Sequence, residues 1–273
     1  MLNFSIIVTV YNKEDTLKRC IKSIIQDITD DYEVIIVDDG STDNSYNIAN
    51  TFSKKDKRIK IYKQENKGIG YSRKKSIEWT KGRYLLFVDA DDYIDSNLLN
   101  VLRLKIIEYD YPDIIRYNLN EINNTKNKSR FLVNNTELIN GIEALYKWNS
   151  NTSTRYGIFT MYTFKTDFIK NHLEEFLEIK CYEDVATITK LLFYADKLLV
   201  LNYMGYYYYR NNSSITLNGK IEKLYWFKLA IEDILKFYKD KLGTKNELYK
   251  IIKSYYDYHL NRKKNLNIVK IYN

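Results

Sequence analysis

The chain has 273 residues, of which 45% are hydrophobic and 29% are charged, a composition that excludes a disordered or fibrous protein. This length is enough for one large domain or two small ones. No apolar run approaches the ~20 residues of a membrane-spanning helix. The N-terminus lacks the pattern of a signal peptide, so we expect a cytoplasmic protein.

The two cysteines, Cys20 and Cys181, form no Cys-x-x-Cys pair, so no thiolate zinc site is indicated. A disulfide framework is not expected, and a reducing compartment is favoured. The formal net charge of +8 is concentrated in residues 220–273, which hold 13 Lys+Arg and 6 Asp+Glu. Two interpretations stay open, a solvated lysine-coated surface and attraction to an anionic membrane face. No nucleic-acid-binding motif accompanies the charge, so no nucleic-acid partner is expected.

The first hundred residues predict strands alternating with helices. Short β-branched apolar runs predict buried strands at residues 4–10, 34–37, 59–62 and 84–88. Helical periodicity predicts helices at residues 17–25, 44–53 and 70–80. Asn12 is expected to cap the first helix and Gly82 to mark the end of the third. This alternation predicts an α/β fold with a mainly parallel sheet flanked by helices.

The pattern loosens after a helix predicted at residues 96–108. Residues 118–135 are rich in Asn, Lys and Thr and predict a loop or irregular excursion. Helices are predicted at residues 136–148, within 181–194, and through most of 220–273. We expect boundaries near residues 110 and 219, which leave a helical C-terminal extension.

Polar side chains follow three of the predicted strands. Ligands of parallel α/β sheets bind at the carboxyl ends of the strands, where Thr9, Asp38-Asp39 and Asp89-Ala90-Asp91 lie. Acidic groups at neighbouring strand ends repel each other unless a cation lies near them, and Mg²⁺ and Mn²⁺ take carboxylate and phosphate oxygens. In an extended segment the two carboxylates of an Asp-x-Asp element face one ligand. The plain alternative is a helix-capping cluster, for which Asp92 and Asp95 are candidates.

Three ordered segments make the pattern specific: SIIVTVYNKEDTLKRCIKSI, EVIIVDDGSTDNS and NKGIGYSRKKSIEWTKGRYLLFVDADDYI. Together they resemble the family 2 glycosyltransferases of the GT-A fold. A fourth segment, YEDVATITKLLFYADKLLVLNYMGYYYYRNNSSIT, resembles the acceptor-side half of bacterial members. The resemblance therefore covers roughly residues 5–216 and leaves out the C-terminal extension.

The resemblance implies roles for individual residues. Asp91 matches a ligand of a divalent metal, Mn²⁺ or Mg²⁺. Asp184 matches a general base, and its neighbour Glu183 an accessory acid on the acceptor side. The residues that match contacts to the nucleotide sugar are Thr9, Tyr11, Asp39, Asn66, Arg73, Asp89, Arg210, Ser213 and Ser214.

The function implied is inverting transfer of a sugar from a nucleotide-diphosphate donor, a UDP-sugar, to an acceptor hydroxyl. The acceptor would be a glycan or lipid-linked glycan in surface polysaccharide or glycoconjugate synthesis. The basic C-terminal extension would hold the enzyme peripherally at the inner face of the plasma membrane. Residues 1–110 would form the nucleotide-sugar-binding half, residues 111–218 the acceptor-binding half, and residues 219–273 the basic extension.

Other interpretations compete with this one. Gly68-Ile69-Gly70 begins like a dinucleotide-binding fingerprint, but Arg73 stands at the third glycine, which argues against a dehydrogenase. A nucleotidyltransferase would need a glycine-rich loop after the first strand. A non-catalytic glycan-binding protein would keep the nucleotide residues and lose the base. Arg73 could form only an ion pair, and Glu183 and Asp184 could be only favourable charges at a helix start.

Overall fold

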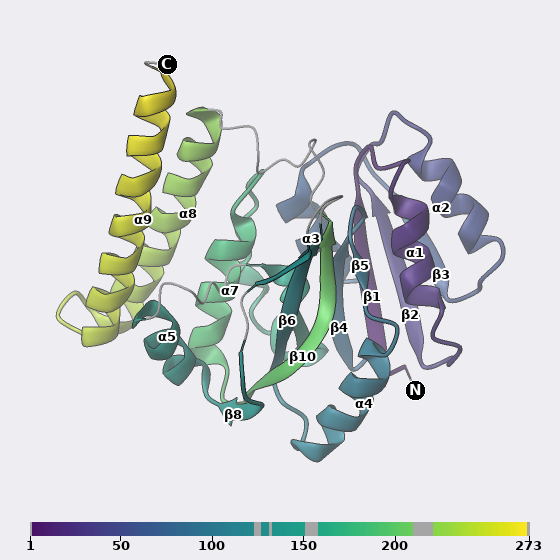
Figure 1. Ribbon diagram of the computed structural model, residues 1–273, viewed down its shortest axis with the longest axis horizontal. Helices are drawn as coiled ribbons and strands as arrows, with labels where there is room; N and C mark the ends of the chain where they lie inside the picture. Colours follow the sequence, from purple (N-terminus) through teal and green to yellow (C-terminus); the bar gives the residue numbers. More distant parts are fainter. Residues whose placement is uncertain (1, 123–126, 131–132, 151–157, 210–220, 272–273) are drawn as a thin grey trace.

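The computed structural model describes residues 2–122, 127–130, 133–150, 158–209 and 221–271. Their strands form one sheet in the order β3-β2-β1-β4-β9-β6-β10-β5, with β7 paired to β6 and β8 paired to β10 (Figure 1). The strands are β1 (Phe4–Val10), β2 (Tyr32–Asp38), β3 (Ile59–Lys63), β4 (Tyr84–Asp89), β5 (Tyr93–Ile94), β6 (Ile114–Ile122), β7 (Asn127–Arg130), β8 (Glu137–Ile139), β9 (Tyr162–Lys165) and β10 (Leu198–Tyr209).

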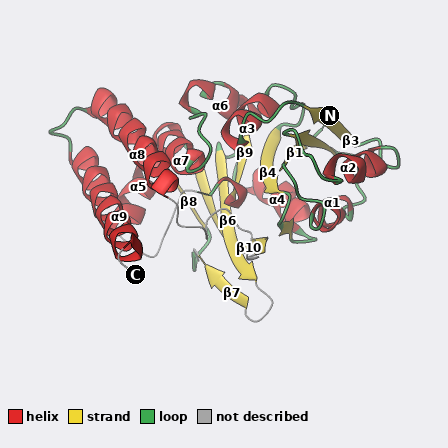
Figure 2. Cartoon of the chain, turned by 90° about the horizontal axis from the view of Figure 1, so that it is seen from above, coloured by secondary structure: helices red, strands yellow, loops and turns green. Residues whose placement is uncertain are grey.

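Helices flank the sheet on both faces. Seen from above, α3 and α6 lie on one side of the sheet and α1 and α4 on the other (Figure 2). The helices are α1 (Leu17–Ile25), α2 (Ser45–Ser53), α3 (Ile69–Ile77), α4 (Leu98–Glu108), α5 (Gly141–Ser150), α6 (Thr166–Lys170), α7 (Glu183–Tyr194), α8 (Ile221–Leu242) and α9 (Glu247–Ile271).

The direction of the strands places six of their carboxyl ends on one side of the sheet. Strands β3, β2, β1 and β4 pair in parallel. Strand β9 is antiparallel to both β4 and β6, so β6 and its parallel partner β10 run in the same direction as β4. The carboxyl ends of β1, β2, β3, β4, β6 and β10 therefore meet at one edge, called here the carboxyl edge. The predicted mainly parallel α/β fold is confirmed.

The first helix buries the face that the sequence predicts, but two helix ends differ from the expected positions. The buried face predicted for α1 is present, since Leu17, Cys20, Ile21 and Ile24 are buried. Asn12 does not cap α1, whose N-cap is Thr16. Gly82 is not the end of α3, which stops at Ile77. It is a glycine because a Cβ there would lie 2.3 Å from the backbone of Phe4.

Two predictions in the middle of the chain were wrong. The segment at residues 118–135, expected to be irregular, contains most of β6 and all of β7. Its buried Asn118 satisfies its amide with the backbone of Val133, whose N–H it accepts at 2.8 Å. The helix expected at residues 136–148 begins only at Gly141, because residues 137–139 form β8 against β10.

The C-terminal helices are joined to the rest of the fold by buried polar contacts. Helices α8 and α9 lie side by side beyond α7 (Figure 1). Their buried tyrosines both reach Thr189 of α7: Tyr238 donates to its carbonyl at 2.6 Å, and the Tyr256 hydroxyl lies 2.9 Å from its hydroxyl. The predicted helical pattern is confirmed. Among the described residues, no helix has the length and apolarity needed to cross a bilayer.

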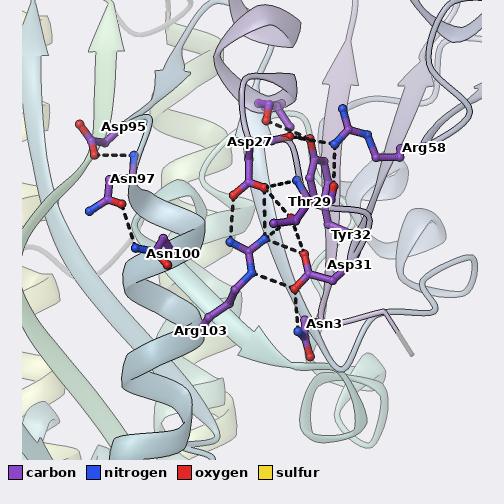
Figure 3. Close-up of polar contacts among 11 residues, drawn as sticks. Asn3, Asp27, Thr29, Asp31, Tyr32, Arg58, Asp95, Asn97, Asn100 and Arg103 are labelled. Atoms are coloured by element: carbon purple, nitrogen blue, oxygen red, sulfur yellow. Dashed lines mark hydrogen bonds and ion pairs between the residues drawn. The ribbon is translucent and has the colours of Figure 1, made fainter.

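An arginine fastens the edge opposite the carboxyl edge (Figure 3). Arg103 of α4 donates to Asp27 at 2.9 Å and to Asp31 at 2.6 Å, both in the connection between α1 and β2. It also donates to the hydroxyl of Thr29 at 2.6 Å. The Arg103 hydrogen bonds hold the pKa of Asp31 well below its usual range. We call these residues the Arg103 cluster.

Candidate active site

The ends of β1, β2 and β4 bring the first predicted residues together. Thr9 lies opposite Asp89 in the pairing of β1 with β4. The N–H of Asp39 donates to the carbonyl of Val10 at 2.8 Å, which holds the end of β2 beside the end of β1. Tyr11 follows directly and is 47% exposed, so its ring is available to a ligand at the carboxyl edge.

Asp39 fastens the loop that carries Asn66. Its carboxylate accepts the side-chain N–H of Gln64 at 2.7 Å and the backbone N–H groups of Lys67 and Gly68, both at 2.9 Å. Gly40, which follows Asp39, has φ of +77°, and a Cβ there would meet the backbone nitrogen of Asn66 at 2.8 Å. The glycine therefore allows the two loops to approach each other. A contact from Asp39 or Asn66 to a nucleotide stays a prediction.

The two carboxylates of the Asp-x-Asp element bind different cations. The chain turns at this point, since the N–H of Asp92 donates to the carbonyl of Asp89 at 2.9 Å. Asp89 pairs with Arg73 at 2.6 Å, and Asp91 pairs with Lys13, also at 2.6 Å. The expectation that an extended segment turns both carboxylates toward one ligand is therefore not met in this conformation. No local pattern marks Lys13 as part of the site, because its partner lies far along the chain.

Arg73 joins the two halves of the site. Its guanidinium is buried and bridges Asp89 at the end of β4 to Glu183 at the start of α7. Burial raises the pKa of Glu183, which Arg73 lowers only in part. A contact from Arg73 to a nucleotide stays a prediction. We call Arg73, Asp89, Glu183 and Asp184 the Arg73 cluster.

Asp184 lies in the first turn of α7, as predicted. One of its oxygens accepts the N–H of Val185 at 2.8 Å. Burial, followed by the charge of Glu183, raises the pKa of Asp184 well above its usual range, while Arg73 lowers it. The direction is opposite to the one expected from the helix N-terminus alone, because desolvation and a neighbouring carboxylate outweigh the helix dipole. A carboxylate with a raised pKa suits a general base.

A buried ring of hydrogen bonds ties the Asp-x-Asp turn to β10. The hydroxyl of Tyr206 donates to Asp92 at 2.8 Å and accepts the N–H of Asp89 at 3.1 Å. The other oxygen of Asp92 accepts the N–H of Tyr209 at 2.8 Å. Burial raises the pKa of Asp92, with Asp91 next in effect. Asp92 is thus not a helix cap, whereas Asp95 does accept an N–H before α4, from Asn97 at 3.0 Å.

The strand β10 leads into the element expected to hold the diphosphate. That element contains Arg210, Ser213 and Ser214, which lie outside the described residues. Among the described residues there is no group of three or more His, Cys, Asp or Glu side chains that could hold a metal. Asp91 still fits Mg²⁺ or Mn²⁺, since such ions commonly use one or two carboxylates together with phosphate oxygens of the substrate.

Comparison with known proteins identifies the family that this chain resembles. Residues 5–168 match the model described as glycosyl transferase family 2. The chain is 30% identical over 225 residues to glycosyltransferase GlyG of Streptococcus pneumoniae serotype 4, covering 77% of this chain and 72% of that protein. It is 40% identical over 102 residues to the poly(ribitol-phosphate) beta-glucosyltransferase of Bacillus spizizenii, covering 36% of this chain and 16% of that protein.

A solved structure shares the fold. S. aureus TarS 1–349, crystallised in complex with UDP, superposes with a TM-score of 0.68 at 20% sequence identity. The match covers 97% of this chain and 91% of that one. At this identity the likeness establishes the GT-A-type fold, a mainly parallel sheet flanked by helices with two helices at the C-terminal end.

Proposed function

The chain belongs to glycosyl transferase family 2 and is a glycosyltransferase, and on this premise we propose that it transfers a sugar from a UDP-sugar to an acceptor hydroxyl with inversion. The observation that carries the proposal is the Arg73 cluster. Through the ion pairs of Arg73 with Asp89 and Glu183, it joins the first turn of α7, where Asp184 lies, to the end of β4. The loops expected to hold the nucleotide meet at the same edge of the sheet.

The residues divide the reaction between them. Tyr11 and Asp39 would hold the base, and Asp89 the ribose. Asp184 would take the proton of the acceptor hydroxyl while the hydroxyl oxygen bonds to the anomeric carbon of the donor sugar. The bond from that carbon to the diphosphate breaks on the opposite side, and UDP leaves with the electron pair. A divalent metal on Asp91 would supply positive charge to the departing diphosphate.

The test measures turnover of UDP-sugars in the presence and in the absence of a divalent metal. We expect Asp91→Asn to remove an anionic ligand of the metal and to reduce transfer sharply, with an unchanged melting curve. Turnover of UDP-sugars should be measured for both proteins with Mn²⁺, with Mg²⁺ and in excess chelator. Full activity of the wild type in chelator would show that Asp91 does not act through a metal.

The nucleotide assignment has a separate test. We expect Asp39→Ala to weaken UDP binding by about 1–3 kcal/mol, because a donor of the base loses its acceptor. Calorimetry decides this. Since Asp39 also holds the loop of Asn66, Gln64→Ala serves as a control that removes one loop contact and keeps the carboxylate. An equal loss in both variants would assign the effect to the loop.

We further propose that the acceptor is a surface polymer or lipid-linked glycan, and that the basic helices α8 and α9 hold the enzyme at an anionic membrane. The start of α8 carries three consecutive aromatic residues, Tyr225, Trp226 and Phe227, and only some of them can face a membrane. Tyr225 is 56% exposed, but Phe227 is buried and packs against Tyr182. Sedimentation with anionic and neutral vesicles, at low and high salt, tests the proposal. Equal binding to both kinds of vesicle would contradict it.

A further inference from the structure

A lysine already holds the carboxylate that we assign to the metal. The ammonium of Lys13 lies 2.6 Å from Asp91, and the two side chains are only 23% and 19% exposed. Partly buried pairs of this kind are screened less by solvent than fully exposed ones. Any metal that binds Asp91 must therefore compete with a cation that the protein itself supplies.

The turn that carries Lys13 is fixed by its backbone. The N–H of Lys13 donates to the hydroxyl of Ser45 at 2.8 Å. The preceding Asn12 has φ of 51° and accepts the N–H of Thr42 at 2.8 Å. Because the turn between β1 and α1 is bonded to the loop after β2, the backbone of Lys13 cannot retreat from the site. When its ammonium leaves Asp91, the side chain stays within reach of whatever has replaced it.

The group that displaces the Lys13 ammonium from Asp91 determines where the ammonium goes. A divalent ion carries two positive charges and arrives with a diphosphate, so it can displace a single ammonium from Asp91. The diphosphate then presents several anionic oxygens to the released lysine, and lysine binds phosphate as a compact point charge. We propose that Lys13 is a ligand of the donor diphosphate, held on Asp91 until the donor and its metal bind. This inference rests on the proposed function.

The inference separates Lys13 from an ordinary structural ion pair. A structural pair would lose stability on mutation and leave ligand affinities unchanged. A displaced ligand has two opposite effects when it is removed. Without the lysine, UDP loses a partner and binds more weakly, whereas a metal alone gains access to Asp91 and binds more tightly.

The experiment compares Lys13→Met with the wild type and with Lys18→Met, a control that removes an exposed lysine of α1. UDP affinity is measured by calorimetry in chelator and with Mn²⁺, and Mn²⁺ affinity without nucleotide by electron paramagnetic resonance. For Lys13→Met we expect UDP affinity with Mn²⁺ to fall roughly tenfold, the size of one charge-assisted hydrogen bond, and to change little in chelator, where the wild-type lysine stays on Asp91. Mn²⁺ affinity without nucleotide should rise. Lys18→Met should match the wild type in both.

A second variant guards against misfolding. Lys13→Arg keeps the charge and should retain UDP affinity within about threefold, because the diphosphate still meets a cation. Unchanged affinities in Lys13→Met, or an equal loss in the Arg and Met variants, would overturn the inference and leave the proposed function standing. If the wild type binds no UDP with or without Mn²⁺, the proposed function itself fails and the inference fails with it.

Discussion

Arg73 and Arg103 each neutralise carboxylates at opposite edges of one sheet, but the pKa values of the acids around them shift in opposite directions. Each guanidinium pairs with two carboxylates from other elements. In the Arg103 cluster one guanidinium serves two acids, further donors are present, and the pKa of Asp31 is lowered. In the Arg73 cluster one guanidinium serves three acids, because Asp184 lies beside the pair, and the pKa values of Glu183 and Asp184 are raised.

The difference shows how to separate a structural cluster from a reactive one. Both contain arginine and aspartate, so residue types do not distinguish them. What differs is burial and the ratio of charges. Arg103 is 18% exposed in its side chain and Arg73 only 4%. A buried site with more carboxylates than cations favours the uptake of a proton, and the base of a transfer reaction has to take up a proton.

The largest effect on activity should come from substituting Asp184, the acid that has no cation of its own in the Arg73 cluster. We expect Asp184→Asn to reduce turnover by about 10²–10⁴, because the amide keeps the shape but cannot take the proton. UDP affinity should stay nearly unchanged. Steady-state kinetics and calorimetry on the same preparations measure both, with Glu183→Gln as the matched variant. A dead Glu183→Gln beside an active Asp184→Asn would make Glu183 the base, and two active variants would reduce the pair to a helix-end feature.

The next effect concerns stability. Arg73→Met leaves the buried Glu183 and the partly buried Asp89 without their cation, so we expect a loss of about 3–5 kcal/mol in the free energy of unfolding. Urea denaturation at neutral pH measures it. The loss should shrink as the pH is lowered, since protonation of the acids removes their need for a cation. A loss no larger than that of Arg103→Met would remove the distinction between the two clusters.

The pH dependence of turnover tests the cause of the raised pKa. A base works only when ionised, so turnover should rise with pH through the raised pKa of Asp184, above the ~3.9 of an ordinary aspartate. Glu183 raises this pKa and Arg73 lowers it. Glu183→Gln should therefore move the acid limb of the profile to lower pH. A limb that stays in place would mean that Glu183 does not set the ionisation of the base.

The sequence predicted the strand ends well and their partners poorly. Runs such as residues 34–37 are apolar along their whole length because both faces of a central parallel strand are covered, so they are visible locally. In β6 the pattern is obscured by Arg116, Asn118 and Glu121, which are nonetheless buried. Such polar groups fit a strand only when distant parts of the fold supply their partners, and a local pattern cannot show this.

The same limit applies to the site. Asp89, Asp91 and Asp184 could be selected because of the elements that they end or begin. Lys13, Asp92 and the role of Arg73 could not, since each depends on a pairing across the fold. Asp92 seemed to belong to a capping cluster, and only the approach of β10 shows that its carboxylate accepts from Tyr206.

The smallest effect should come from Arg103→Met. The cluster is partly exposed and its acids keep other donors, such as Asn3 on Asp31 at 2.7 Å, so we expect a loss of only about 1–2 kcal/mol in the free energy of unfolding. The pKa of Asp31 is lowered in the fold, so the stabilisation is present at neutral pH and is lost as the pH falls below about 4. Urea denaturation of both proteins at pH 7 and near pH 3 should show the difference shrinking. Turnover and UDP affinity should match the wild type, since the cluster lies at the edge opposite the site. A changed Michaelis constant would show that the two edges communicate, and the division between a structural and a reactive arginine would then fail.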